Sequence, residues 1–130
     1  MRSAVIVSTA RTPIGRAYRG GFNNTPSPTL ASHAIKAAVE RAKIDGAEVE
    51  DVLMGAALQQ GSQAGNVART ALLRAGLPVT VPGMTMDRQC SSGLMTIATA
   101  ATPSRMLDTR IDAPAVCAVA DADSTLLGGA

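Results

Sequence analysis

Residues 84–94 read MTMDRQCSSGL and join a short apolar segment directly to the start of a helix. Met84–Met86 is a strand candidate, and a helix is expected from about Ser91 to Ala101, where Pro103 limits it. Cys90 therefore falls at a strand-to-helix turn. At such a turn, free backbone N–H groups and the positive end of the helix dipole stabilise a thiolate, which is the reactive form of cysteine.

The position of Cys90 has two interpretations. The same N–H groups are suited to stabilise the oxyanion of an acyl intermediate, and Gly93 removes a side chain just after the turn. Against this, most unpaired cysteines are small core residues. Spacing alone leaves both a nucleophile and a buried packing residue open.

Outward from this turn, strand-like and helix-like segments alternate along the chain. The order βαβαβαβ predicts an α/β fold with a mostly parallel sheet and crossover helices. The expected strands are Ala4–Val7, Val52–Leu58, Met84–Met86 and Ala115–Ala120, and the other expected helices begin after Ser27 and at Val67.

The first two helices carry their own end signals. Ser27 and Pro28 are expected as N-cap and first helical residue, with Ile35 and Val39 on the apolar face. Asn66 is expected to cap the helix that runs from Val67 to Ala75, and Gly76 to end it.

The composition describes one domain over residues 1–130 with few bulky side chains. Of the 130 residues 46% are hydrophobic, but 24 are alanine and the aromatic residues are Tyr18 and Phe22 alone. This predicts close backbone packing, or a core that needs further protein. The apolar runs are too short to cross a bilayer, so no membrane span is expected.

Charge and cysteine content exclude several classes of function. The net charge is +2, and the basic first third lacks the lysine clusters and interleaved aromatics of nucleic-acid binders. One histidine and the distant Cys90 and Cys117 form neither a metal site nor a disulfide framework. The start lacks a signal-peptide pattern, so a reducing cytoplasmic location is expected.

The segment CSSGL at 90–94, preceded by RQ at 88–89, resembles the nucleophile motif of the thiolase family. The opening AVIVSTARTPIG at 4–15 is similar to the first strand and loop of that family, as are 52–55 and 61–76 with GNVAR at 65–69. The resemblance covers residues 2 to about 101 in one register and implies the N-terminal half of the thiolase fold, as if truncated. Residues 102–130 diverge from the family pattern.

The resemblance implies acyl transfer between CoA thioesters with Cys90 as nucleophile. In the family, the matching cysteine attacks a 3-ketoacyl-CoA, acetyl-CoA leaves, and a second CoA accepts the acyl group in a ping-pong reaction. Acyl-CoA and CoA are then substrates, and no bound cofactor is expected. The RQCSSG form is more similar to the 3-ketoacyl-CoA thiolase branch, although Asp87 and Met95 stand where that branch more often has Asn and Gln.

The family's second half supplies a histidine base, a second cysteine and a glycine-rich segment, and no such motifs occur here. His33 is expected on a helix surface or in packing, and Cys117 in a buried strand. An acyltransferase, an inactive fragment and a module that complements a separately encoded second half therefore stay open. Ketoacyl synthases share the fold, but TPIG at 12–15 favours the thiolases.

Other polar residues have simpler structural interpretations. Arg11 and Arg16 are suited to CoA phosphates but fit a connecting loop better, and Arg69 fits loop or subunit packing. Ser91 and Ser92 are expected to satisfy backbone groups. An apolar face without its normal cover predicts a homo-oligomer or other association.

Overall fold

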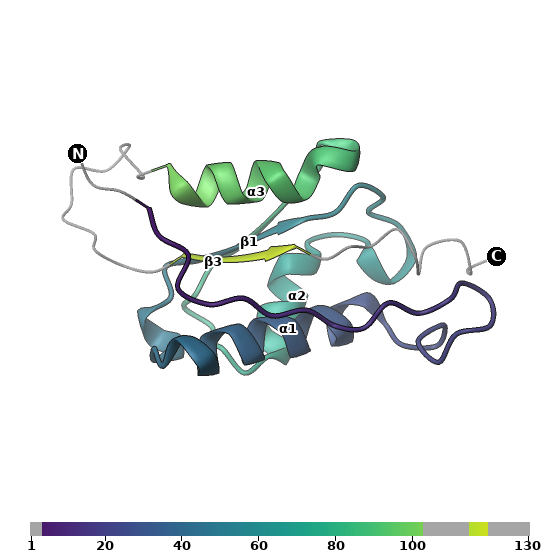
Figure 1. Ribbon diagram of the computed structural model, residues 1–130, viewed down its shortest axis with the longest axis horizontal. Coiled ribbons are helices and arrows are strands. Elements are labelled where there is room, and N and C mark those ends of the chain that lie inside the picture. Colours follow the sequence, from purple (N-terminus) through teal and green to yellow (C-terminus); the bar gives the residue numbers. More distant parts are fainter. Residues whose placement is uncertain (1–3, 103–114, 120–130) are drawn as a thin grey trace.

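The computed structural model describes residues 4–102 and 115–119 and contains one parallel sheet. Its order is β2-β1-β3, with β1 at Asp51–Gly55, β2 at Gly83–Met86 and β3 at Ala115–Val119. Helices α1 (Ser27–Ala42) and α2 (Val67–Arg74) cover one face, and α3 (Ser92–Ala101) covers the other (Figure 1). The 3-10 helices are η1 (Gly46–Glu48), η2 (Gly61–Gln63) and η3 (Gln89–Ser91). The predicted α/β class with a parallel sheet and crossover helices is confirmed.

The apolar core lies between the sheet and the α1–α2 layer. Val52 and Met54 of β1 point into it because alternate residues of a strand face the same side. Ile35 of α1 and Leu72 of α2 pack against them and are almost completely buried. Both faces of β1 are covered, as expected for the central strand of a parallel sheet.

The end signals of the helices are confirmed for α2 and corrected for α1. The Asn66 side chain accepts a hydrogen bond from Arg69 N at 3.2 Å, and Gly76 ends the helix with a φ of 88°. At α1 the N-cap position is Pro26, one residue earlier than predicted. Ser27 does not cap the helix with its side chain, because its hydroxyl lies 3.1 Å from that of Ser62.

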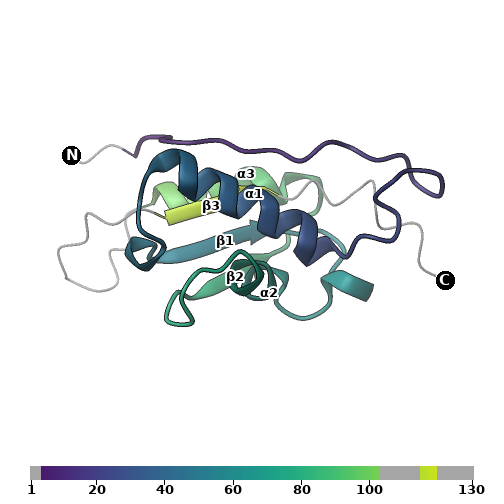
Figure 2. The same ribbon diagram turned by 90° about the horizontal axis from the view of Figure 1, so that it is seen from below.

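The prediction of a strand at Ala4–Val7 is wrong. Residues 4–26 form no strand, and Val5, Ile6 and Val7 are 71–79% exposed. The segment runs extended along the outside of the molecule (Figure 2), where Thr9 O accepts a hydrogen bond from Arg41. Its composition favours a strand, but a strand also needs a partner, and the segment pairs with neither of the edge strands β2 and β3.

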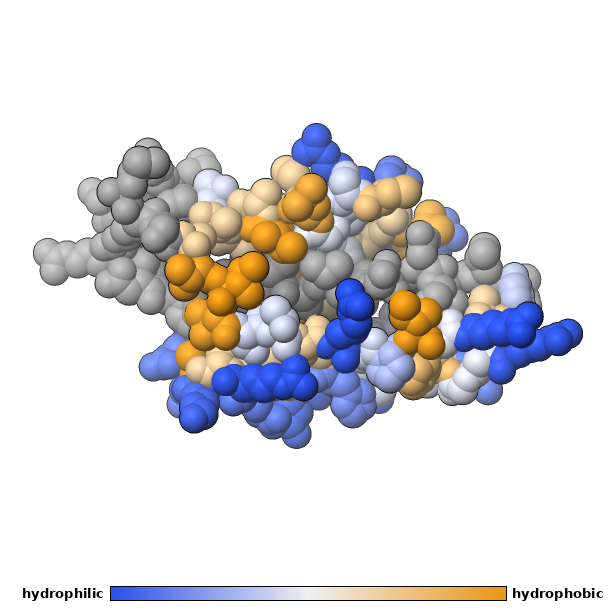
Figure 3. Space-filling view, in the orientation of Figure 1, coloured by the Kyte–Doolittle hydropathy of each residue, from blue (hydrophilic) through white to orange (hydrophobic). Residues whose placement is uncertain are grey.

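Helix α3 presents its polar residues to the sheet and its apolar residues outward. Ser92 and Thr96 are buried, whereas Leu94 and Ile97 are exposed. Figure 3 shows apolar side chains gathered over this helix and the N-terminal segment, and hydrophilic ones over α1. An ordinary surface helix has the opposite arrangement. Most of the segment that diverges from the family pattern, namely residues 103–114 and 120–130, lies outside the described residues.

The first turn of α3 lies directly on the end of β1. A Cβ added to Gly55 would be 2.6 Å from Ser92 C and 2.8 Å from Gly93 N, both of which are backbone atoms. Such a contact cannot be relieved by turning a side chain. The helix and the strand therefore approach this closely only because residue 55 is glycine.

We expect Gly55→Ala to lower the free energy of unfolding by about 2 kcal/mol or more, as overpacking against backbone does. Urea unfolding followed by circular dichroism measures this. Gly21→Ala is the matched control because nothing lies within 4 Å of its added Cβ, and its effect should stay within about 0.5 kcal/mol. Equal stability of the two variants would contradict the close packing.

Candidate active site

Cys90 lies between β2 and α3, as predicted. β2 ends at Met86, and the short helix η3 carries Cys90 into the first turn of α3 at Ser92. We call residues 87–92 the elbow. The Cys90 side chain is exposed, so the interpretation of this cysteine as a core residue is wrong.

The elbow bends sharply at Gln89. This residue has a φ of 50°, in the left-handed region that non-glycine residues seldom adopt. Asp87 Oδ1 accepts a hydrogen bond from Gln89 N at 2.7 Å, and the Gln89 amide Nε2 lies 3.3 Å from Asp87 Oδ2. These contacts fix the residue that immediately precedes the cysteine.

Side-chain hydroxyls hold the rest of the elbow. Ser92 Oγ accepts from Arg88 N at 2.8 Å and donates to Gln89 O at 2.7 Å. Ser91 Oγ donates to Arg88 O at 2.9 Å. The prediction that the two serines satisfy backbone groups is confirmed.

The backbone N–H of Cys90 has no hydrogen-bond partner within residues 4–102 and 115–119. Its neighbours Arg88, Gln89 and Ser91 all donate, to Ser92 Oγ, Asp87 Oδ1 and Arg88 O respectively. A free donor therefore lies on the same residue as an exposed thiol. This is the arrangement that stabilises negative charge on the oxygen of an attacked carbonyl.

The charged groups of the elbow are held separately. Arg88 Nη1 lies 3.2 Å from Met95 Sδ, along the first turns of α3, while the Asp87 carboxylate faces Gln89. The Asp87 side chain is thus held by the residue two positions on, and the Arg88 side chain by a residue of α3. The helix N-terminus adds a positive partial charge at the same place.

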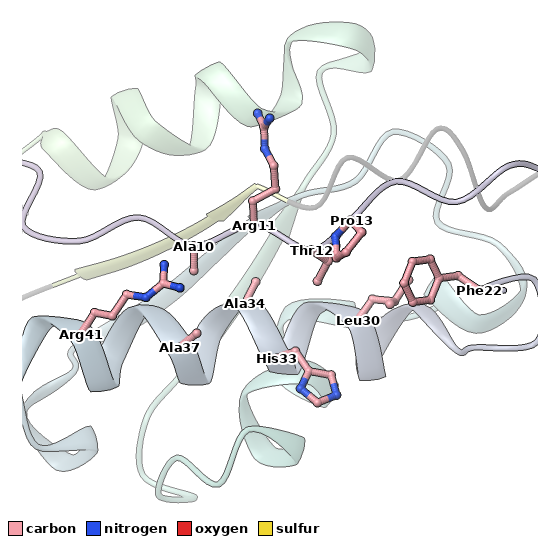
Figure 4. A pocket seen from close by; sticks show the side chains of 10 residues that line it. All are labelled: Ala10, Arg11, Thr12, Pro13, Phe22, Leu30, His33, Ala34, Ala37 and Arg41. Carbon is pink, nitrogen blue, oxygen red and sulfur yellow. The ribbon is translucent and has the colours of Figure 1, made fainter. Parts of the chain in front are cut away.

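The remaining polar candidates lie elsewhere. An open hollow of about 330 Å³ between α1 and the N-terminal segment is lined by Arg11, His33 and Arg41 among others (Figure 4). Arg11 and His33 extend in opposite directions, so these groups do not converge on one ligand. His33 is exposed on α1, which agrees with the predicted surface role.

The polar residues predicted for loop or strand roles also keep away from the elbow. Arg69 donates to Val81 O and Val79 O, which confirms its loop-packing role. Arg16 lies in the exposed N-terminal segment and Cys117 in β3. Cys90 is thus the sequence-predicted site residue that occupies the elbow.

Sequence reasoning missed two contributors to the elbow. The family pattern marks Asp87 only as a departure, although an aspartate whose side chain accepts from the N–H two residues on is a common turn signal. Gly55 gave no local signal, because its contact with α3 joins residues far apart in the chain.

The fold and the elbow define an α/β protein with an exposed cysteine at the start of a helix. A family model described as "Thiolase, N-terminal domain" matches residues 4–111. The chain belongs to the thiolase family, as its motifs predicted. Within residues 4–102 and 115–119, none of the helices is long and apolar enough to cross a membrane.

Individual relatives agree with this assignment. The chain is 44% identical to a 3-ketoacyl-CoA thiolase of Saccharophagus degradans over 77% of its length and 26% of the relative, and 48% identical to an acetyl-CoA acetyltransferase of Escherichia coli over 78% and 25%. The crystal structure of the Bacillus anthracis acetyl-CoA acetyltransferase superposes with a TM-score of 0.72 at 42% identity, over 78% of this chain and 25% of that one. The chain thus spans about a quarter of the length of these relatives.

We expect iodoacetamide to modify Cys90 in the folded chain, because the thiol is exposed. Mass spectrometry of the digested protein identifies the modified peptide, and Cys90→Ala provides the blank. Modification of Cys90 only after unfolding in urea would contradict the exposed position.

Proposed function

We propose that the chain uses Cys90 to accept an acyl group from a CoA thioester. The observation that carries this proposal is the exposed thiol beside its own unpartnered N–H at a helix start. Membership in a family whose matched relatives are named acetyl-CoA acetyltransferase and 3-ketoacyl-CoA thiolase supports it. CoA thioesters are therefore the substrate class.

The acylation step follows from the elbow geometry. The Cys90 thiolate attacks the thioester carbonyl carbon, a carbon–sulfur bond forms, and the carbonyl electron pair moves to oxygen. The Cys90 N–H donates to that oxyanion. Collapse of the intermediate breaks the bond to the CoA sulfur, and CoA leaves as a thiolate that takes a proton from water. With a 3-ketoacyl-CoA a carbon–carbon bond breaks instead, and the acetyl-CoA carbanion needs an acid to protonate it.

We propose further that the 130-residue chain is acylated without multiple turnover. His33, the one histidine of the sequence, lies on α1, across the sheet from α3 (Figure 1). The general base, the acid and the nucleophile of such sites act as a unit, so a nucleophile alone performs the first step and stalls.

Incubation with acetyl-CoA should place one acetyl group on Cys90, with none in Cys90→Ala. Mass spectrometry measures the adduct, and thiol release measured by absorbance should stop near one equivalent. Continuous CoA release that Cys90→Ala abolishes would overturn the single-turnover proposal. A thiol that iodoacetamide modifies but acetyl-CoA does not acylate would overturn the acyl-transfer proposal.

We propose that the outer face of α3 is an association surface. Leu94 is 70% exposed and Ile97 41%, and the helix sequence SGLMTIATAA contains no charged residue. Two copies of such a face pack together without like-charge repulsion, and its alanines allow close approach. The same face favours the alternative of a module that docks with a separately encoded second half.

Sedimentation velocity should show concentration-dependent self-association that Ile97→Lys removes. Leu73→Lys is the matched control, because Leu73 is 45% exposed on α2, at the opposite face of the sheet, and it should leave association intact. A monomer at all concentrations would exclude a second copy as the partner.

A further inference from the structure

Two side chains of the elbow accept hydrogen bonds from the backbone N–H groups of the two residues before Cys90. Asp87 Oδ1 accepts a hydrogen bond from Gln89 N at 2.7 Å, and Ser92 Oγ accepts one from Arg88 N at 2.8 Å. The acceptors differ in kind: one is a carboxylate before the bend, and the other is a hydroxyl in the first turn of α3. Between them they leave the Cys90 N–H unoccupied among residues 4–102 and 115–119.

The same two side chains hold the bend itself. Gln89 would relax from a φ of 50° toward a common conformation if its N–H lost the Asp87 acceptor. Ser92 Oγ also donates to Gln89 O at 2.7 Å, so it contacts the 87–88 peptide unit and the 89–90 peptide unit, which carries the Cys90 N–H. Ser92 is only 5% exposed and is backed by Gly55, which gives the hydroxyl a fixed base.

We propose that Asp87 and Ser92 are positioning residues that orient the Cys90 N–H toward the oxygen of an attacked thioester. The role rests on the proposed acylation of Cys90, since it concerns the oxyanion formed when the thiolate adds to the carbonyl carbon. Neither side chain touches the substrate. They act through the backbone of residues 88 and 89, which sets the direction of the peptide unit of Cys90.

A positioning role separates two reactions of the same thiol. Acylation builds negative charge on oxygen and uses the N–H, whereas alkylation by iodoacetamide is a direct displacement at carbon and uses no oxyanion donor. Loss of one oxyanion donor slows acyl transfer by about a hundredfold or more in well-studied enzymes. Misdirection of the donor should cost roughly tenfold or more in acylation and leave alkylation within about twofold.

The test compares acylation and alkylation rates of Cys90 in Asp87→Ala and Asp87→Asn. Both variants lack the carboxylate charge, but asparagine keeps the Oδ1 acceptor. The acylation rate, measured with acetyl-CoA, should fall at least tenfold in Asp87→Ala and be restored in Asp87→Asn. Ser92→Ala should behave as Asp87→Ala does.

Asp45→Ala is the matched control. Asp45 Oδ1 accepts from Ala47 N at 3.0 Å, which is the same bond to the residue two positions on, but Asp45 precedes β1 and so lies at the other end of the sheet. Its removal should leave both rates unchanged. Equal losses of acylation and alkylation in Asp87→Ala, or no loss in either, would overturn the positioning role.

A second measurement remains valid if the chain is not acylated at all. Amide hydrogen exchange followed by NMR should show faster exchange of the Gln89 N–H in Asp87→Ala than in Asp87→Asn. If the unsubstituted chain is not acylated but the exchange rates still differ in this way, the proposed function is refuted. The conclusion that Asp87 fixes the conformation of the elbow then still stands. Identical exchange in both variants would overturn that hold.

Discussion

The close contact between Gly55 and the first turn of α3 is the constraint on which the rest of the structure depends. It seats Ser92 C within 2.6 Å of where a side chain on residue 55 would begin. Because β1 and β2 are parallel and Gly55 pairs with Met86, the elbow must leave the sheet beside this contact. The contact thus sets the distance between the end of β2 and the start of α3, and this distance limits the backbone conformations that the elbow can adopt.

The same contact explains why α3 turns polar residues inward. A helix this close to a strand leaves room for hydroxyl-sized side chains, and Ser92 and Thr96 fill it. Their hydroxyls donate to carbonyls within the helix or the elbow, with Thr96 Oγ1 reaching Gly93 O at 2.7 Å, so burial leaves these donors satisfied. The bulky residues Leu94 and Ile97 then have only the outward face. The apolar outer surface of α3 is thus a result of this tight interface.

Sequence patterns predicted the features that depend on neighbours in the chain. The cap at Asn66, the end of α2 at Gly76 and the cysteine at a helix start all follow from signals within a few residues. The sequence-based predictions failed where the structure depends on a contact with a residue far away in the chain. The residues Ala4–Val7 have strand composition, but strand formation depends on pairing with a strand elsewhere in the chain, which no local pattern reports. The contact of Gly55 with α3 was missed for the same reason.

The groups that the proposed reaction needs also fall into local and distant ones. The hydrogen bonds that hold the backbone around Cys90 lie within residues 87–92, and the elbow rests against Gly55 of the neighbouring strand. In the proposed acylation the oxyanion donor is the backbone N–H of Cys90 itself, so this donor needs no residue from outside the elbow. Proton transfer to a leaving carbon or thiol has no such local source, since the single histidine of the sequence lies on α1, across the sheet. Under the proposed function, acylation therefore needs only the groups of the elbow, whereas repeated turnover needs proton-transfer groups that the elbow does not hold.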